Sequence, residues 1–276
     1  GNVFDWFEIN KKFSKYKEML HKMVNKGDKI AMGYLGCIYA LDNDFDNASK
    51  FFELGASQKD VSSCEALYYL YMNEFMEKEI PEKYVDKKRA LTYGKQATAL
   101  GHADIANKMG VIYDEGKIVP KDMTEAIKYY EIAVSYGNTF ACNNLASCYR
   151  DGNGVEQNYE KAVELYKKAA EQGYAGAQNE LGVLLFRGDG VEQDYNLALH
   201  WFELAASNGN EVAKENVDET RRKINESSRI LSDSDLEELK KNDEAMKKNM
   251  QKIGRELNDE ISSITDELRT DGFFDI

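Results

Sequence analysis

Proline is scarce in this sequence of 276 residues, with only Pro81 and Pro120 present. Because proline removes a backbone donor and breaks helices, its scarcity leaves long stretches of the chain free to be helical. Alanine, leucine, lysine and glutamate, which favour helices, are plentiful. The composition therefore predicts an all-α protein.

Long apolar runs and an excess of basic residues are also lacking. No run approaches the roughly 20 apolar residues that span a bilayer, and no basic-then-apolar signal segment opens the chain. The net charge of -13 opposes the phosphates of nucleic acids and the surfaces of anionic membranes, so neither is expected as a partner. We expect a cytoplasmic protein. Because the sequence begins with Gly1 rather than Met, an exported form with a removed signal stays open.

Residues that carry chemistry are few. Cys142 and Cys148, two of four cysteines, are six apart on one expected helix and too far apart to bridge, which favours reduced thiols. The three histidines have no Cys or His at metal-ligand spacing, and there is no phosphate loop, Gly-x-Ser-x-Gly elbow or Cys/His pair. We expect no catalytic residue, metal or cofactor. An enzyme with carboxylates as an acid/base pair is an alternative.

Several residue types recur every 36 residues, which predicts tandem repeats. The recurring residues are two glycine series, two alanine series and one aromatic series: Gly101, Gly137, Gly173 and Gly209; Gly116, Gly152 and Gly188; Ala90, Ala126, Ala162 and Ala198; Ala97, Ala133, Ala169 and Ala205; and Tyr130, Tyr166 and Phe202.

Each repeat has the pattern of two helices. Ala141, Leu145 and Tyr149 lie four residues apart and make one apolar stripe, which predicts a first helix. A turn follows at 151–154, and a second apolar stripe then predicts a second helix that ends at a glycine with a left-handed conformation. Asp122, Asn158 and Asp194 stand where they can cap the start of the second helix.

The units 137–172 and 173–208 resemble the Sel-one-like repeat, a relative of the tetratricopeptide repeat. Family units carry Leu-Gly in the first helix, a Gly-x-Gly-Val loop, Asp-Tyr, and Ala-Ala before the next glycine. This chain offers Leu181-Gly182, Gly188-Asp-Gly190-Val191, Asp194-Tyr195 and Ala205-Ala206; it departs from the family at Ile105, Ala146 and Leu185. The resemblance covers about 27–225 and is most specific within 101–209. It implies a scaffold or adaptor that binds proteins rather than an enzyme.

The predicted architecture is an α/α superhelix, or solenoid, of about five 36-residue helix-pair repeats. Residues 1–26 are interpreted as an N-terminal capping helix, 27–210 as five Sel-one-like repeats, and 211–230 as a C-terminal capping helix. Solenoids need such caps because each terminal repeat has an apolar face to cover. Residues 231–276 are interpreted as a long amphipathic tail helix.

First-helix residues that point away from the core are expected to line the concave face and bind an extended peptide. An amide series could hydrogen-bond a peptide backbone; alternatively, the asparagines bridge adjacent repeats or are simply solvated. The predicted binding residues are Asn107, Lys108, Asn143, Asn144, Ser147, Asn179 and Glu180.

The tail helix carries a narrow apolar seam that resembles a coiled coil interrupted by a stutter. It could pack back on the repeats, pair with a second copy or another partner, or be disordered until bound. Its predicted contact residues are Met246, Met250, Ile253, Leu257, Ile261, Ile264 and Leu268, followed by the apolar Phe273, Phe274 and Ile276. The function predicted is a protein- or peptide-binding scaffold. The alternative is an inhibitor or immunity-type binder of one target.

Overall fold

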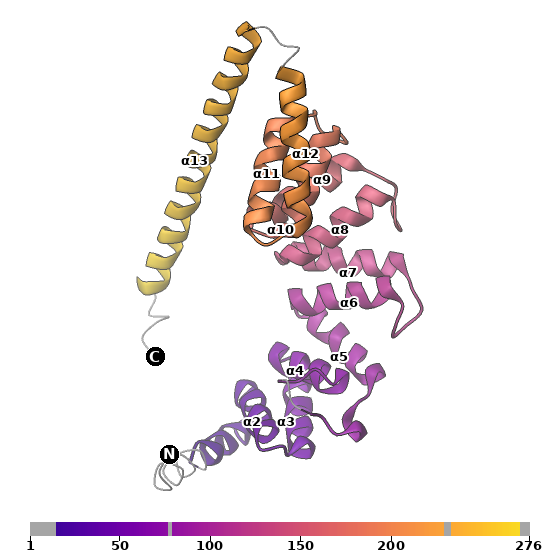
Figure 1. The fold of residues 1–276 in the computed structure, drawn as a ribbon. Coiled ribbons are helices and arrows are strands. Elements are labelled where there is room, and N and C mark those ends of the chain that lie inside the picture. Colours follow the sequence, from indigo (N-terminus) through magenta and orange to yellow (C-terminus); the bar gives the residue numbers. More distant parts are fainter. Residues whose placement is uncertain (1–14, 77–78, 229–232, 271–276) are drawn as a thin grey trace, which may run out of the picture.

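The structure is a computed structural model that describes residues 15–76, 79–228 and 233–270 (Figure 1). Within these ranges the chain forms helices and connecting loops, with no strand. Consecutive helices pack on one another along the whole series from α2 to α12, which gives a stack of helix pairs. The predicted all-α solenoid is confirmed.

Two kinds of helix alternate in the stack, and we call them A and B helices. The A helices are α2 (Lys29–Leu41), α4 (Val61–Met72), α6 (Ala103–Glu115), α8 (Thr139–Asp151), α10 (Ala175–Arg187) and α12 (Glu211–Ser228). The B helices are α3 (Phe45–Ser57), α5 (Lys87–Ala99), α7 (Met123–Ser135), α9 (Tyr159–Glu171) and α11 (Tyr195–Ser207). A short 3-10 helix, η1 (Glu82–Tyr84), lies in the connection before α5.

Side chains at the start of the B helices explain where these helices begin. The side chains of Asp122, Asn158 and Asp194 each accept a hydrogen bond from the backbone N–H three residues later, at 3.1, 2.8 and 2.9 Å. These bonds satisfy amides that have no partner inside the helix. At the other end, Gly137 adopts a φ of 81° just after α7, a conformation that glycine adopts without steric cost.

Small residues of the A helices let aromatic rings of the B helices approach closely. A Cβ added at Gly110 would lie 2.5 Å from the ring of Tyr130, and one at Gly182 would lie 2.6 Å from the ring of Phe202. Tyr130 and Phe202 are almost fully buried. Close packing of this kind is the reason that alanine, glycine and one aromatic residue recur in each repeat.

Both ends of the stack carry a further helix. Residues 15–24 are helical, and Leu20 is buried against Ala31, Leu35 and Phe51 of the first pair. At the other end, α12 packs on α11 and buries Ala213.

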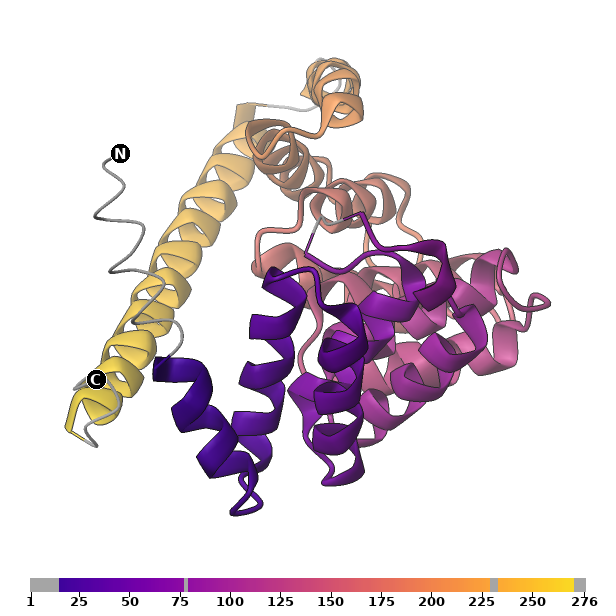
Figure 2. The ribbon, with the colours of Figure 1, turned by 90° about the horizontal axis from the view of Figure 1, so that it is seen from below.

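The last helix, α13 (Asp233–Thr270), turns back and runs beside the stack towards its N-terminal end (Figures 1 and 2). It has no extensive packing contact with any other helix of the described chain. Met250, Ile253 and Leu257 are 37%, 49% and 55% exposed. The apolar seam of α13 is therefore open to solvent along this stretch.

Candidate binding surface

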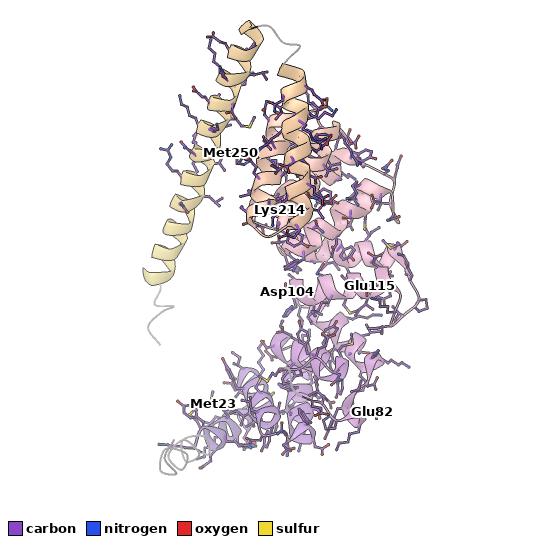
Figure 3. All side chains as sticks on the ribbon, viewed as in Figure 1. Met23, Glu82, Asp104, Glu115, Lys214 and Met250 are labelled. Atoms are coloured by element: carbon purple, nitrogen blue, oxygen red, sulfur yellow. The ribbon has the colours of Figure 1, made fainter. Side chains whose placement is uncertain are left out.

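The predicted binding residues all lie on the A helices α6, α8 and α10. Asn107 and Lys108 are on α6, Asn143, Asn144 and Ser147 on α8, and Asn179 and Glu180 on α10. We use the name A-helix surface for the outward-facing residues of α6, α8, α10 and α12. Figure 3 shows the side chains of these helices, with Asp104 and Glu115 near the two ends of α6.

Two pairs of asparagines join neighbouring A helices. Asn144 donates from Nδ2 to Oδ1 of Asn107 at 3.1 Å, and Asn216 donates in the same way to Asn179 at 2.8 Å. The partners in each pair are 37 residues apart, one more than the repeat length. The bonds therefore connect one position of each repeat to the following position of the next repeat.

Asn143, which lies one repeat after Asn107 and one repeat before Asn179, does not form such a bond. Oδ1 of Asn143 is buried and has no hydrogen-bond partner among the described residues. The residue 37 positions later is Glu180, where the other pairs have an asparagine. An ionised carboxylate has no proton to donate, so Glu180 cannot satisfy Oδ1 of Asn143 as Asn144 satisfies Asn107.

Glu180 instead belongs to an ion cluster with Arg150 and Asp151. The Arg150 guanidinium donates to both carboxylate oxygens of Asp151 at 2.7 and 2.9 Å, and a third nitrogen, Nη1, contacts Glu180. The hydrogen bonds from Arg150 lower the pKa of Asp151. The same interactions raise the pKa of Arg150, which stays charged. One cation faces two carboxylates, so the cluster carries one net negative charge.

A pocket of about 630 Å³ surrounds this cluster and spans α8, α10 and the start of α12. Val183 and Val212, which is 60% exposed, contribute apolar surface to the pocket. Asn179 and Asn216 contribute side-chain amides. Its lining residues are Arg150, Asp151, Gln157, Tyr159, Asn179, Glu180, Val183, Leu184, Arg187, Asp189, Val212 and Asn216. The pocket thus combines apolar surface with donors and acceptors, as peptide sites do.

Of the seven predicted binding residues, only Asn179 and Glu180 line this pocket; Asn107, Lys108, Asn143, Asn144 and Ser147 lie outside it. Lys108 forms an ion pair with Glu74 at 3.4 Å and lies over the ring of Tyr69. Ser147 donates to the backbone carbonyl of Asn143 and is hydrogen-bonded to the hydroxyl of Tyr166 at 2.8 Å. Both side chains are therefore held by contacts within the stack.

The comparisons with known proteins identify the repeats. Residues 103–138, 139–174 and 175–210 each match the Sel1 repeat family. Residues 103–210 are three Sel1 repeats. The predicted resemblance to the Sel-one-like repeat is confirmed for this stretch, which contains all seven predicted binding residues.

Solved structures of repeat proteins are similar to this chain, and two of them cover about three quarters of it. One is a protective antigen present in uropathogenic Escherichia coli strains and displaying an SLR fold, at 29% identity over 73% of this chain with a TM-score of 0.63. The chain covers only 43% of the length of that antigen. The other is a Sel1 repeat protein from Oxalobacter formigenes, at 24% identity over 78% of this chain and 88% of its own length, with a TM-score of 0.62. No curated protein matches the chain.

The other pocket residues were not predicted from the sequence, and Arg150, Arg187 and Asn216 are among them. Asn216 could have been found, because it follows Glu180 by one repeat length of 36 residues. Arg150 and Arg187 have no such signal, because the equivalent position 36 residues before Arg150 is Asp114.

The described residues contain neither a cluster of metal ligands nor a cysteine whose pKa is lowered. No group of three or more His, Cys, Asp and Glu side chains in the described residues is placed to hold a metal ion. Burial raises the pKa of Cys64 and Cys148 to about 11, which keeps these thiols protonated. No helix in the described part of the chain is both long and apolar enough to cross a bilayer.

The predicted tail contacts stand apart from the Sel1 repeats. Met246 is partly buried, and Ile253, Leu257 and Met250, which Figure 3 labels, are exposed on α13. The side chains of Ile261, Ile264 and Leu268, and all of residues 271–276 with Phe273, Phe274 and Ile276, lie outside the described residues.

Proposed function

We propose that the chain is a non-enzymatic scaffold that binds an extended peptide, or an extended segment of a protein, on its A-helix surface. The pocket around Arg150 and Glu180 is the centre of the proposed site. The observation that carries the proposal is that this pocket crosses three consecutive A helices and combines apolar surface with polar groups. A ligand that contacts several repeats must be extended, and Sel1 repeats elsewhere are generally scaffolds.

Arg187 supports a peptide ligand in particular. It lines the pocket at the end of α10, is exposed, and forms no ion pair or hydrogen bond with the described residues. Its guanidinium can therefore donate to a peptide carbonyl or a carboxylate without first breaking a bond inside the protein. Arg150 is less available, because its three nitrogens already donate to Asp151 and Glu180.

The asparagine pairs supply further polar groups. The bond between Asn107 and Asn144 uses one polar atom of each side chain and leaves Nδ2 of Asn107 and Oδ1 of Asn144 to face a ligand. Each amide is also held in place by the other. A peptide backbone that binds there meets groups that are already ordered, which lowers the entropy cost of binding.

The test begins with a partner captured from the source cell and identified by mass spectrometry. Its affinity is then measured by calorimetry for the wild type and for Arg187→Glu, which reverses a charge on the pocket and disturbs no bond in the fold. We expect Arg187→Glu to weaken binding at least tenfold. The control is Lys88→Glu, which makes the same charge change on B helix α5 and should bind like the wild type.

A second variant tests the asparagines. Replacement of Asn107, Asn143, Asn144 and Asn179 by alanine should weaken binding to the same partner, provided that circular dichroism shows the helices intact. Unchanged affinity in both this variant and Arg187→Glu would remove the A-helix surface as the binding site. The number of partners captured separates a scaffold from a binder of a single target.

A further inference from the structure

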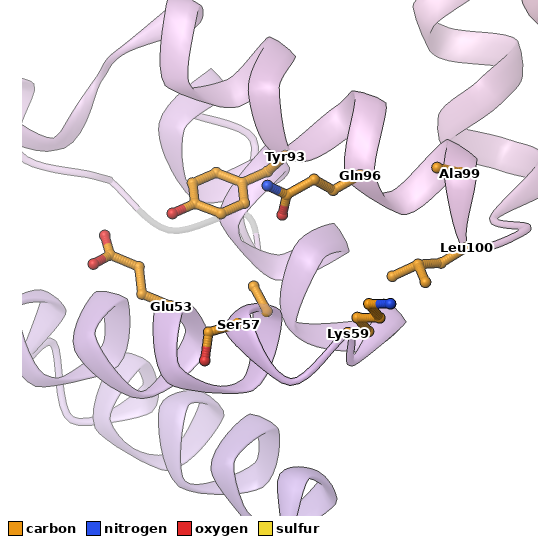
Figure 4. A pocket seen from close by; sticks show the side chains of 8 residues that line it. Glu53, Ser57, Lys59, Tyr93, Gln96, Ala99 and Leu100 are labelled. Atoms are coloured by element: carbon orange, nitrogen blue, oxygen red, sulfur yellow. The ribbon is translucent and has the colours of Figure 1, made fainter.

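A second cleft lies between two B helices, on the other layer of the stack. It has a volume of about 610 Å³ and is lined by Glu53, Ala56, Ser57 and Lys59 from α3 and its end, and by Tyr93, Gln96, Ala99 and Leu100 from α5 and its end (Figure 4). Most of its lining is apolar. None of these residues belongs to the proposed site on the A-helix surface.

Lys59 stands where the other repeats have glycine. Its N–H donates to the carbonyl of Ala56 at 2.9 Å and the next N–H donates to Gly55 at 3.1 Å, the same pattern that Gly137 and Asn138 form after α7. Lys59 has a φ of 59°, and Gly137 has a φ of 81°. A side chain is disfavoured in this left-handed region, so the chain carries a strained lysine at a position where glycine would be relaxed.

The ammonium of Lys59, which the strained backbone carries, is the one charged group among the cleft-lining residues that has no partner in the described chain. Figure 4 shows Lys59 near Leu100 at one end and Glu53 at the other. Glu53 accepts a hydrogen bond from the hydroxyl of Tyr71 at 2.7 Å and is paired with Arg89. Lys59 is exposed and has no hydrogen-bond or ion-pair partner among the described residues.

The far wall of the cleft is held rigidly. Arg89 lies over the ring of Tyr71 at 4.3 Å, and Tyr71 is stacked on Tyr93 with the ring centroids 5.9 Å apart. The ring of Tyr93 and the side chain of Gln96 face the space above α3 (Figure 4). The cleft is thus formed before any ligand binds, which reduces the cost of binding.

We propose that this cleft binds a peptide segment in which an acidic side chain is adjacent to an aromatic or aliphatic one. The carboxylate would pair with the ammonium of Lys59, because Glu53 is already neutralised by Arg89. The apolar side chain would pack on Ala56, Ala99 and Leu100, and the Gln96 amide would bond the peptide backbone. This is a second, independent binding surface on the B-helix layer.

The probe is the fluorescent peptide Gly-Phe-Asp-Leu-Asp-Gly, and its matched control has Asn in place of each Asp. Binding to the full chain is measured by fluorescence anisotropy at an ionic strength of about 0.15 M, where distant surface charges are screened. We expect the Asp peptide to bind at least threefold more tightly than the Asn peptide. The protein's net charge of -13 repels the acidic Asp peptide. Tighter binding of the Asp peptide would therefore indicate a cation close to the bound carboxylate.

Lys59→Gly removes the ammonium and relieves the strained backbone, so it should fold at least as well as the wild type. In this variant the Asp and Asn peptides should bind with equal affinity, and Lys59→Arg should restore the preference. Ala99→Trp, which fills the cleft, should weaken both peptides at least fivefold. Arg187→Glu should leave the affinities of both peptides unchanged. The peptide experiment therefore tests the B-helix cleft separately from the site proposed on the A-helix surface.

Three outcomes would overturn the inference. These are absence of saturable binding of the Asp peptide to the wild type, an unchanged preference for the Asp peptide in Lys59→Gly, and unchanged binding in Ala99→Trp.

Discussion

The side chain of Asn216 donates to Oδ1 of Asn179 at 2.8 Å, whereas Oδ1 of the equivalent Asn143 is buried without a partner in the described part of the chain. The two asparagines occupy the same position of successive Sel1 repeats. They differ because the next repeat offers an amide in one case and the carboxylate of Glu180 in the other. A bond between repeats thus depends on a single residue of the following repeat.

This difference predicts unequal effects of alanine substitution. Asn179→Ala should lower the free energy of unfolding by about 1 kcal/mol, because it breaks a hydrogen bond between two repeats. Asn143→Ala should cost less than half as much, because the substitution removes a buried acceptor that has no donor. Urea unfolding monitored by circular dichroism measures both. Equal losses would show that Asn143 has a partner in solution.

The ion cluster predicts a dependence of stability on pH. Arg150 lowers the pKa of Asp151 in the folded state, so the cluster stabilises the fold above the ordinary Asp pKa of about 3.9. This contribution is lost as the pH falls through the folded pKa. Arg150→Gln should therefore lower the urea midpoint at pH 6 and have a smaller effect at pH 3. The control is Arg222→Gln, which breaks the exposed ion pair with Glu219. The prediction would be contradicted if Arg150→Gln lowered the urea midpoint equally at both pH values.

Lys59→Gly is expected to stabilise the fold by about 1 kcal/mol, because glycine adopts positive φ without the steric cost of a side chain. Urea unfolding measures the change. Gly137→Ala provides the reverse experiment at the equivalent position, where nothing lies within 4 Å of an added Cβ, so only the backbone conformation is tested. It should destabilise the fold by a similar amount. If Lys59→Gly lowered the urea midpoint, strain at this lysine would be excluded.

The exposed seam of α13 predicts self-association through the tail. Met250, Ile253 and Leu257 give it a row of exposed apolar side chains, and α13 has no extensive packing contact with another described helix. We expect light scattering to give a dimer for the full chain and a monomer for residues 1–230. The double substitution Met250→Glu and Ile253→Glu should also give a monomer, while Lys252→Glu on the same helix should not. Monomer masses for all forms would discard self-association.

The fold could be predicted from the sequence because its signals are local. Asp194 caps a helix through a bond to an amide three residues away, and Gly137 ends one through its own φ. Neither interaction depends on how the repeats are stacked. The recurrence of Tyr130, Tyr166 and Phe202 then indicated that each helix pair packs in the same way.

The binding site could be predicted less completely, and it stays a prediction. The 36-residue spacing identified Asn107, Asn143 and Asn179 but could not show that the first and last are bonded to the next repeat. Arg187 was not predicted, because the role proposed for it rests on its having no partner among the described residues, which is a property of its surroundings.

The sequence by itself determined the helices, their ends, and the order in which they repeat, because periodic apolar residues, caps and glycines act over a few residues. Only the tertiary structure decided which side chains meet between repeats, where the two clefts lie, and that α13 runs beside the stack without extensive packing contacts. Those features depend on the rotation between one helix pair and the next. That rotation is set by the packing of many side chains at once, and no short motif encodes it.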